Sequence, residues 1–422
     1  MNTLFTVLIA IFAIGYAAII FEYTIKINKT AVALFVAVIL WLFYVLMSPH
    51  PMVHDIGTLS SNLSDVSQII FFLLGAMTLV ELIDSHRGFK FITDIIQTSS
   101  KRKMLWIIAL IAFFVSAILD NLTTTILMIS ILRKLVPNNK DRFLLGCIVV
   151  VAANAGGAWT PIGDVTTTML WINGQLSSLA VMKALLIPSL VSLAVPLLYY
   201  TTQVKGKYTL SKADTQPPEP GAKLVFWAGL GALVFVPIFK ALTGLPPFMG
   251  MLISLATLWI ITDILHHDLK ERQHLKVPHI FTKIDTSSIL FFLGILLCIN
   301  ALEAAGILES LAHWLNREIP SQTLIATLIG LVSAVIDNVP LVAASIGMYP
   351  LESFPMDSSF WHLIAYAAGT GGSILIIGSA AGVAFMGIEK VDFMSYVKKA
   401  SLPILAGYLA GIGAYAAINY LF

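Results

Sequence analysis

The stretch "VSAILDNLTTTILM", residues 115–128, places an aspartate, an asparagine and three threonines at the centre of an apolar segment. A similar pattern occurs a second time as "VSAVIDNVPLVAAS", residues 332–345. A carboxylate inside a membrane-embedded segment is costly and marks a functional site by default. The repeated Asp-Asn pair therefore predicts two related polar elements within a hydrophobic fold.

The composition of the chain predicts a membrane protein with many spans. Of its 422 residues, 58% are hydrophobic and only 11% are charged. Soluble domains carry about 25% charged residues, so this chain has too few to cover a soluble surface. The first apolar run, 4–20, lacks a basic leader and a clear A-x-A site, and we interpret it as a membrane span. Cys147 and Cys298 lie in apolar runs and are predicted to be buried thiols.

Apolar segments of membrane-spanning length recur along the whole chain. The uninterrupted segments are 3–21, 31–47, 69–84, 180–203, 223–239, 248–265, 287–304 and 399–421. Four further segments are interrupted by Gly, Pro, Asn or Asp, namely 104–136, 143–172, 322–350 and 359–389. The sequence therefore predicts an all-α polytopic fold that contains broken helices.

The distribution of Lys and Arg predicts the orientation of these segments. With both termini outside, all of the 25 basic residues except Lys183, Lys240 and Arg317 face the cytoplasm. Loop 48–68 is then an outside loop, and it contains no Lys or Arg. The polar linker 204–222 is cytoplasmic.

Segment 104–136 has basic residues on both flanks, which a single crossing cannot explain. We predict a re-entrant hairpin with arms 104–119 and 123–136, whose tip is Asp120-Asn121. Segment 322–350 has almost no basic residues on either flank, so it is predicted to be a second hairpin that enters from the outside.

Further pairs of motifs occur in the same order in both halves. "FFLLG" at 71–75 corresponds to "FFLG" at 291–294, and "AGGAWTPIG" at 155–163 corresponds to "TGGSILIIG" at 370–378. Chance similarity between apolar segments is the alternative explanation, and three collinear matches disfavour it. Because the two hairpins enter from opposite sides, the repeats are predicted to be inverted. Inverted repeats with broken helices are typical of secondary transporters, whose substrate site lies near the bilayer midplane.

The predicted division of the chain follows from these repeats. It comprises N-terminal scaffold helices 1–68, a first repeat 69–203, the linker 204–222, scaffold helices 223–286 of the second half, and a second repeat 287–422.

The polar residues of the four interrupted segments form the candidate site. Glycines let the chain leave helical geometry, and Pro161 and Pro340 free backbone carbonyls. Carbonyl, amide and hydroxyl oxygens are hard ligands that suit Na⁺. The carboxylates of Asp120, Asp164 and Asp337 lie at helix breaks without a basic neighbour. An unpaired buried carboxylate can exchange a proton for a cation. The candidate ion- and proton-binding residues are Asp120, Asn121, Thr124, Asn154, Asp164, Thr166, Thr167, Asp337, Asn338, Thr370, Ser373 and Ser379, with Na⁺ at Asn121, Asp164 and Asn338.

Structural interpretations of the same residues stay open. Asp120 and Asp337 are also suited to cap the returning arms as N-cap residues, which is compatible with ion binding. The threonines 166–168 and the glycines at 156–157 and 371–372 also suit close helix packing.

Two groups of titratable residues lie at the predicted cytoplasmic face. Glu81 and Asp84, next to Arg87, suit a proton access path or a surface salt bridge equally well. The histidines of loop 266–285 suit a pH sensor, because histidine titrates near neutrality, or a solvated basic loop, which we favour. They are His266, His267, His274 and His279.

Motifs for catalysis are missing from the sequence. We find no phosphate-binding glycine loop, no nucleophile–base pair and no Cys/His spacing for zinc, and no Lys-Ser/Thr follows the glycine-rich stretches. We therefore expect neither an enzyme nor a cofactor.

At these motifs the sequence resembles the NhaD-type sodium/proton antiporters of the ion transporter superfamily. The resemblance covers nearly the whole chain and is most specific in "SAILDNLTTTI", "NAGGAWTPIGDVTTTMLW", "SAVIDNVPLVAA" and "GTGGSILIIGSAAGVAFMG". It implies a homodimeric elevator with a scaffold domain and a moving transport domain. It also implies that the Asp-Asn tips, Asn154, Asp164, Thr166, Thr167 and the Gly/Ser positions after Thr370 line the ion site.

One departure from the wider superfamily bears on the substrate. The dicarboxylate branch carries Ser-Asn-Thr at its hairpin tips, whereas this chain carries Asp-Asn at both. An acid at each tip repels a dianion and favours a cation. We therefore expect an antiporter that exports Na⁺ or Li⁺ in exchange for H⁺ across a bacterial-type cytoplasmic (inner) membrane. The alternatives are a Na⁺-coupled dicarboxylate-type carrier and, more remotely, a channel or a membrane scaffold.

Overall fold

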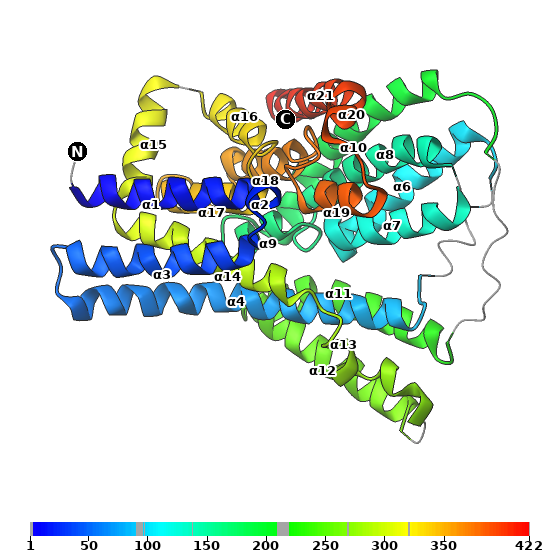
Figure 1. Cartoon of the computed structure of the whole chain (residues 1–422), viewed down its shortest axis with the longest axis horizontal. Helices are drawn as coiled ribbons and strands as arrows, with labels where there is room; N and C mark the ends of the chain where they lie inside the picture. Colours follow the sequence, from blue (N-terminus) through cyan, green and yellow to red (C-terminus); the bar gives the residue numbers. More distant parts are fainter. Residues whose placement is uncertain are drawn as a thin grey trace.

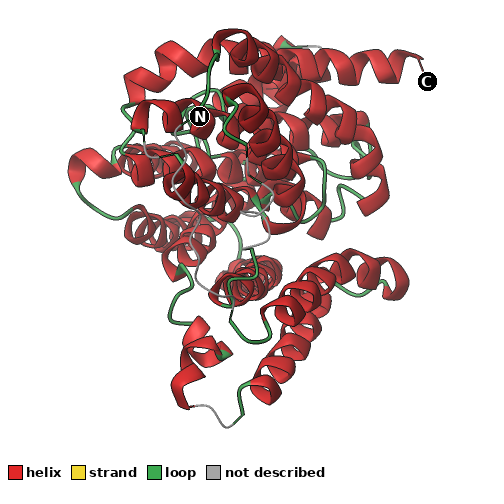
Figure 2. Cartoon of the chain, turned by 90° about the vertical axis from the view of Figure 1, so that its right-hand side faces the viewer, coloured by secondary structure: helices red, strands yellow, loops and turns green. Residues whose placement is uncertain are grey.

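The computed structural model describes residues 3–89, 96, 98–136, 138–208, 219–267, 270–319 and 321–421. Figure 2 shows helices joined by loops, and in these ranges the only β-type pairing is one isolated bridge between Ser100 and Lys207. Ten of the described helices are long and apolar enough to cross a membrane. The predicted all-α, multi-pass membrane fold is confirmed.

The described residues of the first half of the chain form nine helices, which Figure 1 labels. They are α1 (Thr3–Ile20), α2 (Glu22–Ile25), α3 (Lys29–Met47), α4 (Met52–Ser85), α6 (Lys101–Leu119), α7 (Asn121–Leu135), α8 (Asn139–Ala158), α9 (Val165–Ile172) and α10 (Ser178–Gln203). 

The second half continues with a similar alternation of long and short helices. They are α11 (Ala222–Thr243), α12 (Pro247–Leu265), the 3₁₀ helix η1 (Lys270–Leu275), α13 (Val277–Ile280), α14 (Thr286–Ala304), α15 (Ile307–Glu318), α16 (Gln322–Val332), α17 (Asn338–Met348), α18 (Ser359–Gly371), α19 (Ala380–Glu389), α20 (Phe393–Tyr396), the π-helical turn η2 (Val397–Ser401) and α21 (Leu402–Leu421).

The helices pack into two groups, which we name the scaffold group and the core group. In the scaffold group, α3 packs against α1 and α14, and α4 packs against α11, α12 and α14. In the core group, α6 packs on α8, α10 on α21, and α16 on α18. Figure 1 shows α3, α4, α11 and α12 in the lower half of the view and the core group in the upper half. Contacts of α14 with α17 join the two groups.

Both predicted hairpins are broken at their Asp-Asn pair. Helix α6 ends at Leu119 and α7 begins at Asn121, so Asp120 alone forms the break and caps α7. Helix α16 ends at Val332 and α17 begins at Asn338, with Asp337 as the N-cap. The capping interpretation of both aspartates is therefore confirmed. The inverted relation between the two halves stays a prediction.

The two predicted broken crossings are also interrupted at their glycine-rich motifs. Helix α8 ends at Ala158 and α9 begins at Val165, where Asp164 accepts a hydrogen bond from the Thr166 amide as the N-cap. Helix α18 ends at Gly371 and α19 begins at Ala380, where Ser379 is the N-cap. Each break thus frees backbone groups and places a polar cap in the interior of the core group.

The predicted outside loop 48–68 is wrong. Helix α4 begins at Met52 and runs for 34 residues, which is about 51 Å at 1.5 Å per residue. No proline follows Pro51 in this stretch, so nothing stops the helix, and Asp55 and Val66 are buried against its neighbours. Polar composition suggested a loop, but α4 extends beyond the apolar span although most of residues 52–65 are exposed.

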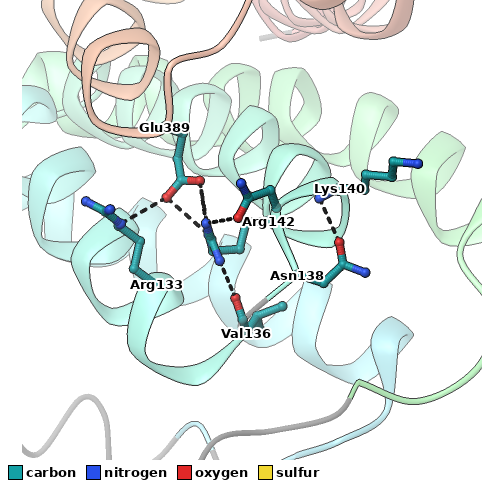
Figure 3. Close-up of polar contacts among 7 residues, drawn as sticks. Arg133, Val136, Asn138, Lys140, Arg142 and Glu389 are labelled. Atoms are coloured by element: carbon teal, nitrogen blue, oxygen red, sulfur yellow. Dashed lines mark hydrogen bonds and ion pairs between the residues drawn. The ribbon is translucent and has the colours of Figure 1, made fainter.

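A buried ion pair ties the end of α19 to the first hairpin (Figure 3). The Arg142 guanidinium donates to both carboxylate oxygens of Glu389, at 3.0 and 3.1 Å. Arg133 lies 3.5 Å from the same carboxylate, and Arg142 also donates to the Val136 carbonyl at 2.8 Å. The Glu389 side chain is only 5% exposed. The cluster therefore joins α7, α8 and α19 at one end of the core group.

Candidate functional site

The breaks of the core group meet at three polar side chains. Asn121, at the start of α7, donates through Nδ2 to Asp164 Oδ2 at 2.7 Å and to Asn154 Oδ1 at 3.0 Å. Asn154 lies on α8 just before its break, and Asp164 lies just before α9. All three residues are buried. The first hairpin tip is therefore bonded directly to the broken crossing of the same half.

The second half of the chain joins the same network through two serines. Asn154 Nδ2 donates to Ser373 Oγ at 2.8 Å and to Ser379 Oγ at 2.9 Å. Both serines lie in the break between α18 and α19, and both are 1% exposed. The backbone carbonyl of Ser373 also accepts from the Tyr396 hydroxyl at 2.8 Å. Residues more than 200 positions apart thus form one buried polar cluster.

Asp164 is the acid at the centre of this cluster. Its Oδ1 accepts from the amide of Thr166 at 2.9 Å and from the Thr166 hydroxyl at 2.7 Å. Its residue exposure is 1%. In the described part of the chain no Lys or Arg forms an ion pair with Asp164. A buried carboxylate without a basic partner needs a proton or a cation to balance its charge.

Asp120 lies beside the cluster but bonds only to its own helix turn. Its carboxylate accepts from the Thr123 amide and from the Thr123 hydroxyl, each at 2.8 Å. Its backbone has φ +85° and ψ 161°, a region that glycine adopts readily and other residues avoid. Such strain costs on the order of 1–3 kcal/mol and persists only where the surrounding structure imposes it.

Asp337 has a different environment from that of its sequence counterpart. Its backbone is relaxed at φ −48°, and it accepts one hydrogen bond, from the Val339 amide at 3.2 Å. Asp337 lines a cavity of about 380 Å³ between the two helix groups. The neighbouring Asn338 is buried, and among the described residues nothing forms a side-chain hydrogen bond with it. The second hairpin tip therefore does not join the hydrogen-bonded cluster.

The remaining candidate residues of the core group lie around the cluster without bonding to it. The Thr124 hydroxyl is buried and has no hydrogen-bond partner in the described structure. Thr167 donates to the Ala158 carbonyl at 3.5 Å, and Thr370 donates to the Tyr366 carbonyl at 2.6 Å. Thr167 and Thr370 therefore satisfy helix carbonyls, which agrees with a packing role.

Glu81 and Asp84 lie in the last turn of α4, outside the cluster. Glu81 accepts from the Ser85 hydroxyl at 3.1 Å and lies 3.8 Å from Lys283 Nζ. Asp84 is exposed. This geometry suits the surface salt bridge, and a role in proton access stays a prediction.

The interpretation of His266 as part of a solvated loop is wrong. His266 is fully buried, and its Nε2 lies 2.9 Å from Nε2 of His86, which the sequence did not single out. His86 follows α4 and His266 follows α12, so the pair joins two scaffold helices. His267, His274 and His279 are exposed, which agrees with the solvated loop.

Lys240 is a further residue that sequence reasoning did not assign to the site. Its ammonium donates to the Trp171 carbonyl at the end of α9 and lies 4.4 Å from the centre of the Trp171 ring. Lys240 belongs to α11 of the scaffold group, so this contact joins the groups close to the broken crossing. Lys240 is one of the three basic residues that the predicted orientation does not place in the cytoplasm. This exception was the signal that could have pointed to Lys240.

Comparison with known proteins identifies the family. The family model described as "Citrate transporter" matches residues 16–371. The chain is 57% identical to "Sodium/proton antiporter 1" of Arabidopsis thaliana, over 97% of this chain and 72% of that protein. It is 52% identical to "Sodium/proton antiporter 2" of the same plant, over 97% of this chain and 98% of that protein.

A bacterial relative shows the same likeness at greater distance. The "Na(+)/H(+) antiporter NhaD" of Vibrio cholerae is 32% identical, over 97% of this chain and 91% of that protein. The likeness thus extends over almost the whole chain, including both hairpins and both broken crossings. The chain belongs to the citrate transporter family and, within it, to the group of NhaD-type sodium/proton antiporters.

Proposed function

We propose that the protein is a secondary active antiporter that exports Na⁺, and also Li⁺, in exchange for H⁺. The observation that carries this proposal is the buried Asp164 carboxylate, which has amide and hydroxyl partners but no basic partner in the described structure. Either a proton or a small cation can balance its charge, and the two compete. The names of the relatives from Arabidopsis thaliana and Vibrio cholerae support the same function.

The cluster offers oxygen ligands around Asp164. Asn121 presents Nδ2 to Asp164, and turning its amide by half a rotation presents Oδ1 instead. Asn154 Oδ1 and the hydroxyl oxygens of Ser373 and Ser379 lie in the same hydrogen-bonded chain. Sodium binding then rearranges these hydrogen bonds, and proton binding to Asp164 restores them. We place Asp120, Asp337 and Asn338 at the edge of the site, where their oxygens approach the ion at another stage.

Transport requires that the site faces each side of the membrane in turn. In the proposed cycle the core group, with both hairpins, slides against the scaffold group as an elevator. Outside protons neutralise the carboxylates, the core group moves, the protons leave to the cytoplasm, and Na⁺ takes their place for export. We further propose a homodimer held by the scaffold groups, with both termini outside the cytoplasmic membrane.

A carrier of citrate or dicarboxylates is the second candidate, because the matching family model is described as a citrate transporter. The chemistry of the site disfavours it. A polyanion needs basic groups or a surplus of hydrogen-bond donors, whereas this cluster is built around Asp164 with Asp120 and Asp337 nearby. A channel or scaffold would have no need for these three acids at helix breaks.

The function is tested in everted membrane vesicles that contain a trapped pH gradient and a fluorescent pH probe. Addition of Na⁺ or Li⁺ to vesicles with the wild-type protein should release lumenal protons. Asp164→Asn should abolish the response while the protein still inserts. Asp263→Asn, an exposed acid in α12, is the matched control and should respond as the wild type does. No response to either cation between pH 7 and 9, together with uptake of citrate or succinate, would contradict the proposal.

A further inference from the structure

A polar cavity of about 380 Å³ lies between the scaffold group and the second hairpin tip. Its scaffold wall is formed by α1, the start of α3 and the start of α14, and its opposite wall by the break between α16 and α17 and by α19. The lining includes Glu22, Lys29, Asp285 and Asp337. The first three lie in segments 22–30 and 266–285, which the distribution of basic residues places in the cytoplasm.

The charges of this cavity favour cations. Three carboxylates, those of Glu22, Asp285 and Asp337, line it against the single ammonium of Lys29. Lys29 Nζ lies 4.4 Å from the centre of the Phe291 ring, so a cation–π contact with this ring stabilises its ammonium. Asp285 is exposed at the start of α14, whereas Asp337 is only partly exposed at the hairpin tip. The acids therefore mark a path from the surface towards the interior.

The inner end of this cavity reaches the first hairpin tip. Leu122, Ser288 and Ala380 line it, and the same three residues also line a smaller cavity of about 60 Å³. The smaller cavity is bounded by Asp120 and Asn121. These three residues are therefore shared by the space beside Asp337 and the space beside Asn121, the residue that bonds to Asp164.

We propose that this cavity is the cytoplasmic vestibule for the transported cation, and that Asp285 is a positioning carboxylate at its mouth. This inference rests on the proposed antiport and on the proposed orientation. Acids on the walls of a narrow, low-dielectric cleft raise the local concentration of cations and their rate of arrival. Asp285 contacts neither Asp164 nor Asn121, so it acts on the capture of the ion and not on its exchange for a proton.

The substitution Asp285→Asn tests this role without removing the helix cap. Asp285 accepts hydrogen bonds from the Ser288 amide and hydroxyl, and asparagine caps helices about as well as aspartate. At low ionic strength the apparent KM for Na⁺ should rise about threefold to tenfold, while the maximal exchange rate stays unchanged. Added choline chloride should reduce the difference between variant and wild type, because salt screens the lost charge.

Asp392→Asn is the matched control. Asp392 also caps a helix, accepting from the Ser395 amide at 2.8 Å, but it does not line the cavity. Its variant should keep the wild-type KM at every ionic strength. An unchanged KM in Asp285→Asn would overturn the vestibule while leaving the antiport standing. A wild-type protein that does not exchange Na⁺ at all would instead overturn the proposed function.

Chemical labelling tests the sidedness of the cavity. Ala384 lines it, and the native Cys147 and Cys298 are both buried. A cysteine introduced as Ala384→Cys should react with a membrane-impermeant cationic thiol reagent in everted vesicles and much more slowly in right-side-out vesicles. Na⁺ should slow the reaction. Faster labelling from the outer face, or equal labelling from both faces, would contradict the cytoplasmic vestibule.

Discussion

Asn121 Nδ2 lies 2.7 Å from Asp164 Oδ2, which joins the tip of the first hairpin to the N-terminus of α9. The bond is buried and has a charged acceptor whenever Asp164 is ionised, which makes it stronger than a neutral hydrogen bond. The hairpin tip and the broken crossing therefore behave as one body. In the proposed elevator cycle, we therefore expect both elements to move together.

Removal of the Asn121 amide should weaken cation binding. Asn121→Ala removes the Oδ1 that the proposed rearrangement turns towards Na⁺. Loss of an interaction with a charged group costs about 1.5–3 kcal/mol, so the apparent KM for Na⁺ should rise about tenfold or more. Asn316→Ala, at an exposed position of α15, is the control and should behave as the wild type does. Proton release in everted vesicles at graded Na⁺ concentrations measures both. A wild-type KM in Asn121→Ala would remove this residue from the site.

The two tip aspartates should respond differently to glycine. Asp120→Gly weakens a cap and adds flexibility to the unfolded chain, which together cost about 1 kcal/mol, but it also relieves the strain at φ +85°, so the free energy of unfolding should change little. Asp337→Gly loses a cap at a relaxed backbone and adds flexibility to the unfolded chain, so it should destabilise by about 1–2 kcal/mol. Thermal unfolding of the detergent-solubilised variants compares them. A larger loss in Asp120→Gly would mean that the backbone at residue 120 is not strained.

Breaking the buried ion pair at the end of α19 should destabilise the core group. Glu389→Gln leaves Arg142 buried without its counter-charge, which costs about 3–5 kcal/mol. The control is Glu318→Gln, because Glu318 pairs with Arg317 at an exposed site where the loss is at most about 1 kcal/mol. Equal melting temperatures for the two variants would show that the Glu389 pair does not hold α7, α8 and α19 together.

The buried histidine pair should make the fold sensitive to acid. His86 Nδ1 donates to the Leu82 carbonyl at 2.8 Å, so neutral His86 accepts at Nε2 and His266 donates to it. Burial lowers the pKa of both histidines below the ordinary 6.5, and at His266 the charges of Arg272 and Lys276 lower it further.

Because the pKa values of His86 and His266 are lowered in the folded protein, acid should reduce its stability. The unfolded chain binds protons at these histidines near pH 6.5, whereas the folded chain resists them, so stability is full above about pH 6.5 and falls as the pH drops below it. Melting temperatures measured from pH 8 to pH 5 should show this decline. His86→Gln should flatten it, while a matching change at the exposed His279 should not. An identical decline in His86→Gln would assign the acid sensitivity to other groups.

The sequence predicted the two Asp-Asn breaks because Asp120 and Asp337 are good N-cap residues, and the structure confirms both caps. The re-entrant hairpins, which rest on the charges that flank each segment, stay a prediction. The glycine-rich motifs predicted the breaks at 159–164 and 372–379 in the same way. Local chemistry decides these features, so they can be read without the fold.

The partners of each polar residue could not be predicted. Asp120 and Asp337 have similar sequence neighbours, yet one is strained beside a buried cluster and the other lines an open cavity. Likewise, Asn154 selects Ser373 and Ser379 but not Thr370, because only their hydroxyls reach its amide in the packed core. The burial of His266 against His86 also depends on packing between distant segments.

The backbone of Asp120 makes position 120 a place where the requirements of folding and of activity can be told apart. One base change converts an aspartate codon into a glycine codon, and glycine suits the observed φ of +85° better than any other residue. Laboratory evolution for heat tolerance alone should therefore admit glycine at position 120. Growth selection on high sodium should return aspartate from the same library, if the carboxylate serves transport. The residue selected for heat tolerance and the residue selected by growth on high sodium would show separately how position 120 contributes to folding and to ion exchange.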